Sequence, residues 1–109
     1  MSENLSAADR QYGDFAPGLV DYTDNVLFGD VWTRPGLSPR DRSLATVAAL
    51  IGGGIIEQLT FHLPYAVRNG VTEAELVEVI THLAFYAGWP KAMSALGVAK
   101  QVLGADKEN

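Results

Sequence analysis

The sequence predicts an all-α fold of five to six short helices, and three observations support this prediction. Apolar residues recur at roughly helical intervals through most of the 109 residues. The apolar/polar alternation of period two that is typical of half-buried strands never persists beyond four residues. Glycine and proline punctuate the chain at the intervals expected between short helices, as in the turn signal Pro35-Gly36.

The first two predicted helices lie in the N-terminal half of the chain. One covers residues 17–29, where a proline stands near the start and a glycine ends or bends the helix. The next covers residues 39–51, with Ser38 as its N-cap and a proline in its first turn. We expect a loop at Gly52-Gly53-Gly54, because each glycine costs about 1 kcal/mol in a helix relative to alanine.

Three further helices are predicted in the C-terminal half. One covers residues 55–68 and stops at Asn69-Gly70, a pair typical of helix ends. Another has the clearest start in the chain, because Thr72 and Glu75 have the spacing of a capping box. The last covers residues 90–103 and begins with a proline, which is favoured at the first helical position.

The chain is long enough for one domain with a modest core. We expect a polar, disordered arm at residues 1–8, a single helical domain over residues 9–103 and a polar tail at residues 104–109. The N-terminus is polar and acidic, unlike a signal peptide, and the longest apolar run is too short and too rich in glycine to span a bilayer. A cytoplasmic protein is therefore expected.

Composition narrows the classes of partner and chemistry. The net charge of −5 argues against nucleic acid or an anionic membrane as the main partner, although a few arginines can still bind a small anionic substrate. The absence of cysteine excludes disulfides, thiolate catalysis and thiolate metal ligands. Two histidines without HExxH or a carboxylate cluster predict no metal site. The excess of apolar over charged residues, 48% against 19%, indicates surface that is covered in an oligomer.

The two histidines are candidates for acid/base chemistry. His62 lies among apolar neighbours, so it is either a core histidine with its hydrogen bonds satisfied or a reactive group. Glu57 is about 140° away from it around a helix and does not share its face. His82 lies one turn after Glu78 and one turn before Tyr86, which also fits the solvated edge of an amphipathic helix.

Arg40 and Arg42 stand at the start of the helix over residues 39–51. They fit either surface ion pairs with Asp41 or Glu57, or a bidentate clamp for a substrate carboxylate. The residues alone leave both interpretations open.

The order of motifs resembles the carboxymuconolactone decarboxylase family. The resemblance covers about residues 15–103 and is most specific in "RNGVTEAEL" and "HLAFYAGWP". It implies an all-α, alkylhydroperoxidase-D-like domain that assembles as a ring-like hexamer, a trimer of dimers. That assembly agrees with the apolar excess of the composition.

The resemblance also separates two chemistries within the family. The alkylhydroperoxidase-D-like branch uses a CxxC pair before a histidine, and those positions are Ile55 and Gln58 here, with Ser43 where the accompanying acid would stand. Peroxidase and disulfide reductase activities are therefore chemically excluded. The sequence is more similar to the decarboxylase branch, which converts 4-carboxymuconolactone to β-ketoadipate enol-lactone in aromatic catabolism, with loss of CO2 and without a cofactor.

This branch implies a role for each candidate residue. His62 acts as the acid/base, and Glu57 orients it or a histidine of a neighbouring subunit. His82 and Tyr86 are oxyanion donors in this interpretation, and Arg42 with Arg40 binds the substrate carboxylate. Phe85 and Trp89 form the walls of the pocket.

Two alternatives stay open at the level of the sequence. The chain is then a different proton-transfer enzyme, acting on an enolisable acid or lactone, or a non-catalytic oligomeric binding module. The glycine-rich segment "IGGGIIEQ" departs from the bulkier residues expected in relatives and makes room for a different or larger ligand.

Overall fold

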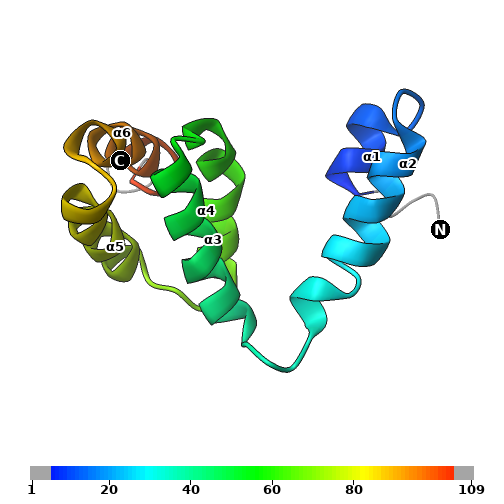
Figure 1. Cartoon of the computed structure of the whole chain (residues 1–109), viewed down its shortest axis with the longest axis horizontal. Coiled ribbons are helices and arrows are strands. Elements are labelled where there is room, and N and C mark those ends of the chain that lie inside the picture. Colours follow the sequence, from blue (N-terminus) through cyan, green and yellow to red (C-terminus); the bar gives the residue numbers. More distant parts are fainter. Residues whose placement is uncertain (1–5, 105–109) are drawn as a thin grey trace. The chain divides into compact units, whose positions relative to one another are not determined.

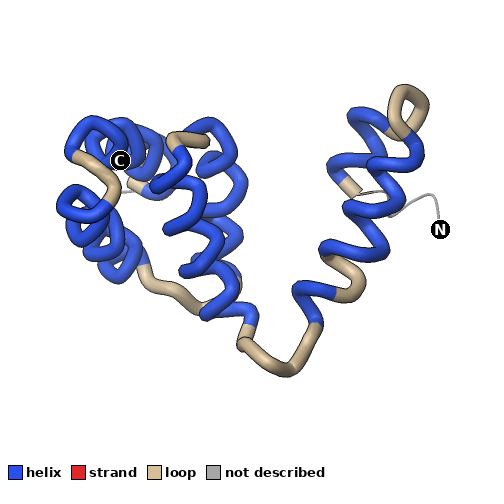
Figure 2. Tube along the Cα trace, in the orientation of Figure 1, coloured by secondary structure: helices blue, strands red, loops and turns tan. Residues whose placement is uncertain are grey.

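The computed structural model describes residues 6–104, and this part of the chain is helical with no strand, which confirms the all-α fold class (Figures 1 and 2). The α-helices are α1 (Ala7–Tyr12), α2 (Pro17–Asp21), α3 (Pro39–Gly53), α4 (Leu59–Arg68), α5 (Glu73–Tyr86) and α6 (Trp89–Leu103). A π-helical segment, η2 (Tyr22–Leu27), continues α2, and η3 (Val31–Thr33) and η4 (Ile56–Gln58) are 3-10 turns.

The helices group into two compact units that meet in the chain between Ser38 and Pro39. This boundary falls inside the single domain expected over residues 9–103. Helix α1 begins inside the arm expected at residues 1–8, and the side chain of Ser6 caps it by accepting from the backbone N–H of Asp9 at 2.9 Å. The rest of that arm, residues 1–5, and residues 105–109 of the expected tail lie outside the described residues.

The N-terminal unit contains α1, α2, η2 and η3. The predicted helix over residues 17–29 is present as α2 and η2, which follow one another without a break. The Ser6 hydroxyl donates to the Asp24 carboxylate at 3.0 Å and so links the start of α1 to η2. Val20 and Trp32 are its buried apolar side chains among the residues described.

The C-terminal unit is a bundle of α3, α4, α5 and α6. Helix α6 packs against α4 and α5, while α3 packs against α4 and α5 (Figure 1). The core contains a continuous cluster of small and aliphatic side chains from all four helices: Val47, Ile51, Leu59, Leu63, Ala66, Val71, Leu76, Ile80, Ala92, Ala95 and Ala99. Within residues 6–104, no helix combines the length and the apolar character needed to cross a bilayer.

The predicted loop at the three glycines is wrong for two of them. Gly52 and Gly53 complete the last turn of α3, and only Gly54, with φ of 74°, leaves the helix. The N–H of Gly54 donates to Ile51 O at 3.0 Å, and that of Ile55 donates to Leu50 O at 2.8 Å. This Schellman arrangement satisfies two terminal carbonyls, so one glycine in the left-handed conformation is enough to end the helix.

The predicted capping box at the start of α5 is confirmed. The Thr72 hydroxyl accepts from the N–H of Glu75 at 3.0 Å, and the Glu75 carboxylate accepts from the N–H of Thr72 at 2.9 Å. Both N–H groups would otherwise lack a partner within the helix.

Replacement of the cap should therefore destabilise the protein. We expect Thr72→Ala to lower the free energy of unfolding by about 1 kcal/mol, measured by urea denaturation. Thr81→Ala is the matched control, because the Thr81 hydroxyl only donates back to Val77 O within α5. Equal losses in the two variants would contradict the importance of the cap.

Candidate functional site

A part-buried hydrogen bond joins α3 to the end of α4. The side-chain amide of Asn69 donates to the Ser43 hydroxyl at 3.0 Å, and Ser43 is only 1% exposed. Ser43 is in the first half of α3 and Asn69 directly follows α4, so the two packed helices run antiparallel. We call the polar strip between them the α3/α4 seam; its side chains are Arg42, Ser43, Thr46, His62, Tyr65 and Asn69.

His62 belongs to this seam because of its helical position. It precedes Asn69 by seven residues, which places both on one stripe of α4 about 20° apart. Since Asn69 contacts α3, His62 faces α3 as well. The imidazole is half-buried, and its Nδ1 atom is hidden from solvent.

Two aromatic rings of α4 lie next to the imidazole of His62. The ring of Phe61 meets it edge-on with centroids 4.9 Å apart, and that of Tyr65 does so at 6.1 Å. Burial lowers the pKa of His62 below its ordinary value of 6.5, because desolvation disfavours the imidazolium form. The histidine therefore holds a proton weakly in the unliganded protein.

Arg42 lies on the same flank of α3. It is half-buried, its Nε atom is hidden from solvent, and the Thr46 hydroxyl one turn later donates to its backbone carbonyl at 2.8 Å. The antiparallel register puts His62 level with about residue 50 of α3, so Arg42 is roughly 12 Å away along the helix axis. Arg42 and His62 therefore supply a guanidinium and an imidazole to two different levels of the seam.

A second candidate region lies on the other flank of α3. This α3/α5 pocket has a volume of about 620 Å³ and is lined by Arg40, Leu44, Ala45, Ala48, Glu75, Glu78, Val79, His82 and Leu83. On α3, Leu44 and Ala48 are separated from Arg42 by the buried stripe that contains Val47. The pocket and the seam therefore open on different sides of α3.

The charges of the α3/α5 pocket differ from those of the seam. Arg40 forms an ion pair with Glu75 and a second one with Asp41 at 3.5 Å. The hydrogen bond from the Thr72 N–H, together with the nearby Arg40, holds the pKa of Glu75 below its usual range. Two carboxylates, Glu75 and Glu78, thus stand beside one guanidinium, which disfavours an anionic ligand in this pocket.

The other expected side chains lie at the outer parts of α5 and α6. His82 and Tyr86 are both exposed, and their rings stack with centroids 4.7 Å apart. Phe85 and Trp89 meet edge-on at 5.6 Å beside a small cavity of about 150 Å³. Glu57, which was expected to orient a histidine, lies elsewhere, in η4. Its side chain is exposed, whereas the Nδ1 atom of His62 is hidden from solvent.

Within residues 6–104 of one chain, the predicted site residues therefore do not form a single site. The pairs are His62 with Arg42 in the seam, Arg40 with His82 in the α3/α5 pocket, and Phe85 with Trp89 at the start of α6. Among residues 6–104, no group of three or more side chains suited to hold a metal ion is found.

Sequence reasoning missed Tyr65 and Arg68. The Arg68 guanidinium lies over the Tyr65 ring, 5.4 Å from its centroid, and Phe61 stacks on the same ring at 5.1 Å. The spacings of four and three residues between Phe61, Tyr65 and Arg68 are those of neighbours on one helix face. This spacing was the available signal.

Comparisons with known proteins place the chain among decarboxylases. A family model described as "Carboxymuconolactone decarboxylase family" matches residues 17–101. A 4-carboxymuconolactone decarboxylase of Acinetobacter baylyi is 39% identical over 100 residues, which are 92% of this chain and 75% of that protein. A nitrosuccinic acid decarboxylase of Metarhizium robertsii is 40% identical over 102 residues, which are 94% of this chain and 71% of that protein. An uncharacterised 15.0 kDa protein of Paracoccus denitrificans is 31% identical over 85 residues, 76% and 63% of the two chains.

The lowered pKa of His62 gives stability a specific pH dependence. Because the unfolded chain binds the proton more tightly, this contribution is fully present above pH 6.5 and is lost as the pH falls below 6.5. We expect His62→Gln to flatten the fall in the free energy of unfolding between pH 7 and pH 5, measured by urea denaturation at each pH. An unchanged slope in the variant would show that burial of His62 does not affect its protonation.

Proposed function

This chain belongs to the carboxymuconolactone decarboxylase family and is a carboxy-lyase, and we propose that it decarboxylates a small organic acid without a cofactor by delivering a proton from His62. The observation that carries the proposal is the position of His62. This histidine is desolvated, faces α3 and shares the seam with Arg42. Such a reaction needs a proton donor and a carboxylate-binding group, and the seam contains one residue suited to each task.

The chemistry explains why these two residue types are required. The bond between carbon and the departing carboxylate breaks, CO2 leaves, and the electron pair stays on the substrate. With 4-carboxymuconolactone, the conjugated lactone carbonyl accepts the pair to give a dienolate, and one proton is then added to carbon. The protein must therefore bind carboxylate, stabilise a developing oxyanion and supply a proton.

We assign the first and last of these tasks to Arg42 and His62. Arg42 binds a substrate carboxylate through its fork of N–H donors. Burial alone leaves His62 mostly deprotonated at neutral pH. An anionic substrate in the seam favours the imidazolium, so binding loads the proton that the reaction consumes.

The substrate is proposed to be 4-carboxymuconolactone, with nitrosuccinic acid as the second candidate. The second candidate is favoured by the relative that carries this name, which is as similar to the chain as the first. Loss of CO2 beside a nitro group also leaves an electron pair that an adjacent acceptor stabilises. Proton delivery from His62 therefore serves both substrates.

The direct test is turnover by the purified protein. We expect conversion of 4-carboxymuconolactone to the enol-lactone, followed by NMR, and a fall in kcat of about 10²–10⁴-fold in His62→Gln, as is typical for loss of a general acid. His82→Gln removes the other imidazole and should cost less than His62→Gln, because His82 is proposed as an oxyanion donor from a neighbouring copy and not as the proton donor. Turnover of neither candidate substrate, or a larger loss in His82→Gln with both variants folded, would contradict the proposal.

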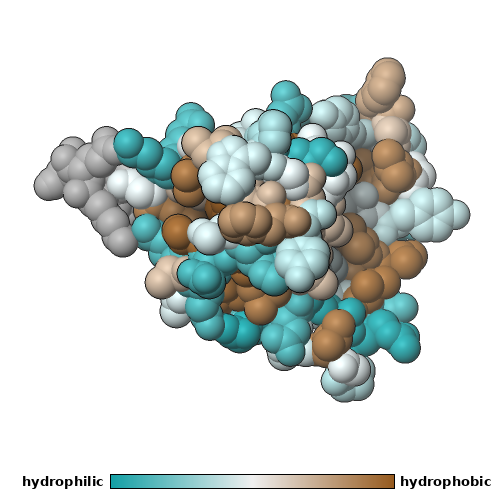
Figure 3. Space-filling model, turned by 60° about the vertical axis from the view of Figure 1, so that its left-hand side comes forward, coloured by the Kyte–Doolittle hydropathy of each residue, from teal (hydrophilic) through white to brown (hydrophobic). Residues whose placement is uncertain are grey.

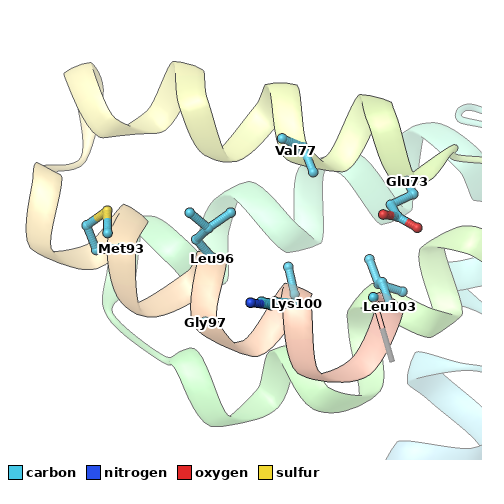
Figure 4. Close-up of a pocket in the computed structure, with 9 residues that line it drawn as sticks. Glu73, Val77, Met93, Leu96, Gly97, Lys100 and Leu103 are labelled. Carbon is cyan, nitrogen blue, oxygen red and sulfur yellow. The ribbon is translucent and has the colours of Figure 1, made fainter. Parts of the chain in front are cut away.

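We propose further that the protein works as a homo-oligomer, in the hexameric form expected for the family. Apolar side chains are exposed on the surface (Figure 3), including Phe85 at 74% and Trp89 at 58%. A groove of about 450 Å³ between α5 and α6 is lined by Val77, Met93 and Leu96 and carries opposite charges, Glu73 and Lys100 (Figure 4). Such a surface is complementary to a second copy of itself.

An oligomer would also explain how predicted site residues outside the α3/α4 seam can take part in the reaction. His82, Tyr86, Phe85 and Trp89 are exposed on α5 and at the start of α6. In an oligomer these side chains can complete the seam of a neighbouring copy, as expected for a site shared between subunits. Their proposed roles as oxyanion donors and pocket walls depend on that contact.

A charge in the groove should disrupt the oligomer. We expect Leu96→Glu to shift the protein to smaller species by light scattering coupled to size exclusion, because it buries an unpaired carboxylate against apolar side chains. Gln101→Glu, on an exposed position of α6 outside the groove, is the matched control and should keep the parental mass. A parental protein that is monomeric would contradict this proposal.

A further inference from the structure

We propose that the outer face of α4 docks into the α3/α5 pocket of a second copy, and that this contact brings His82 of that copy to His62. The outer face of α4 is defined by the side chains of Phe61, Tyr65 and Arg68. The proposal rests on the shared site and the oligomer proposed above. It names the two surfaces that meet and the ion pair that joins them.

The first argument is the composition of the outer face of α4. Phe61 stacks on Tyr65 with ring centroids 5.1 Å apart, and the Arg68 guanidinium lies over the Tyr65 ring at 5.4 Å. Phe61 and Arg68 are seven residues apart, so they share one stripe of the helix, and both are exposed. An exposed cluster of aromatic rings and arginine is typical of the centre of a protein interface.

The second argument is the lining of the α3/α5 pocket. Its volume of about 620 Å³ exceeds that of one aromatic side chain, and its apolar walls include Leu44, Val79 and Leu83. The small side chains of Ala45 and Ala48 leave room on α3 for bulky groups of another chain. The pocket is therefore suited to receive the aromatic rings of the outer face of α4.

The third argument is charge complementarity. Within residues 6–104, the Arg68 guanidinium contacts a ring but no carboxylate, and the Glu78 carboxylate at the pocket has no ion pair or hydrogen bond. Arg40 and Glu75, by contrast, are already paired with each other. The pocket therefore has one carboxylate in excess, and the outer face of α4 has one unmatched positive charge. Docking joins the two without breaking an existing ion pair.

The contact also joins the two halves of the proposed site. Phe61 is the immediate neighbour of His62, and the two rings meet edge-on at 4.9 Å. His82 lines the pocket that receives Phe61 in the proposed contact. Docking therefore places the His82 imidazole of one copy beside the His62 imidazole of the other. His82 then acts as an oxyanion donor at a site that needs two copies.

The symmetry of this contact agrees with a trimer of dimers. The outer face of α4 and the α3/α5 pocket are different surfaces, so the contact is heterologous, and contacts of this kind build rings. The groove between α5 and α6, with Glu73 and Lys100, is proposed above to meet a copy of itself, which gives dimers. A trimer of dimers combines one contact of each kind.

A purely local role for Arg68 makes a different prediction. A positive charge in the last turn of α4 interacts favourably with the helix dipole. Reversal of that charge would then lower the stability of each copy. A second reversal at Glu78, on a different helix, would restore nothing.

The test is a charge reversal on each side of the contact. Arg68→Glu and Glu78→Arg should each reduce the mass, measured by light scattering coupled to size exclusion, to that of the dimer, because each brings like charges together. The combined variant exchanges the two charges and should recover the parental mass. Gln101→Glu adds a charge outside both surfaces and should leave the mass unchanged. Circular dichroism verifies that every variant is helical.

Single variants that keep the parental mass would overturn the proposal. A combined variant that stays at the mass of the single variants would overturn it as well, as would a parental protein no larger than a dimer.

A mixed oligomer tests the shared site. His62→Gln and His82→Gln are co-expressed with different affinity tags and purified over both tags. Where the His82→Gln chain supplies His62 and the His62→Gln chain supplies His82, a site regains both imidazoles. We expect faster turnover of 4-carboxymuconolactone than in an equal mixture of the separately purified variants. Equal rates would overturn the shared site. A parent without turnover that passes the mass test would contradict the proposed function alone.

Discussion

One hydrogen bond joins α3 to the end of α4, and the proposed site depends on how these two helices pack. The half-buried Asn69 amide donates to the Ser43 hydroxyl, which has almost no solvent access. Loss of the Asn69 amide would leave the buried Ser43 hydroxyl without this donor, at a cost of about 1–3 kcal/mol. The bond marks the register of the two helices, and His62 lies on the same stripe of α4 as Asn69 and so faces α3.

The core that stabilises the fold also sets the environment of His62. One side of α4 is buried in the core and consists of Leu59, Leu63 and Ala66. His62 lies at the edge of that side. Its imidazole is therefore desolvated without being enclosed, and its pKa is lowered. Burial of this histidine lowers the stability of the fold at acid pH, where the imidazolium form is disfavoured.

Local signals in the sequence predicted the fold better than they predicted the site. The capping box at Thr72 was predictable because its two hydrogen bonds involve only neighbouring residues. Only one of the three glycines ends α3, because a helix end needs a single left-handed residue, and composition does not say which one. The separation of Arg42 from Arg40 was not predictable, because it depends on which helix covers each flank of α3.

The most direct measurement of the central claim is an NMR titration of both histidines, with and without saturating succinate. The account predicts that the pKa of His62 lies below 6.5 in the free protein and rises when the dicarboxylate binds, since the anion stabilises the imidazolium. A pKa of His62 that does not respond to bound succinate, or a response confined to His82, would contradict the placement of the anion in the α3/α4 seam.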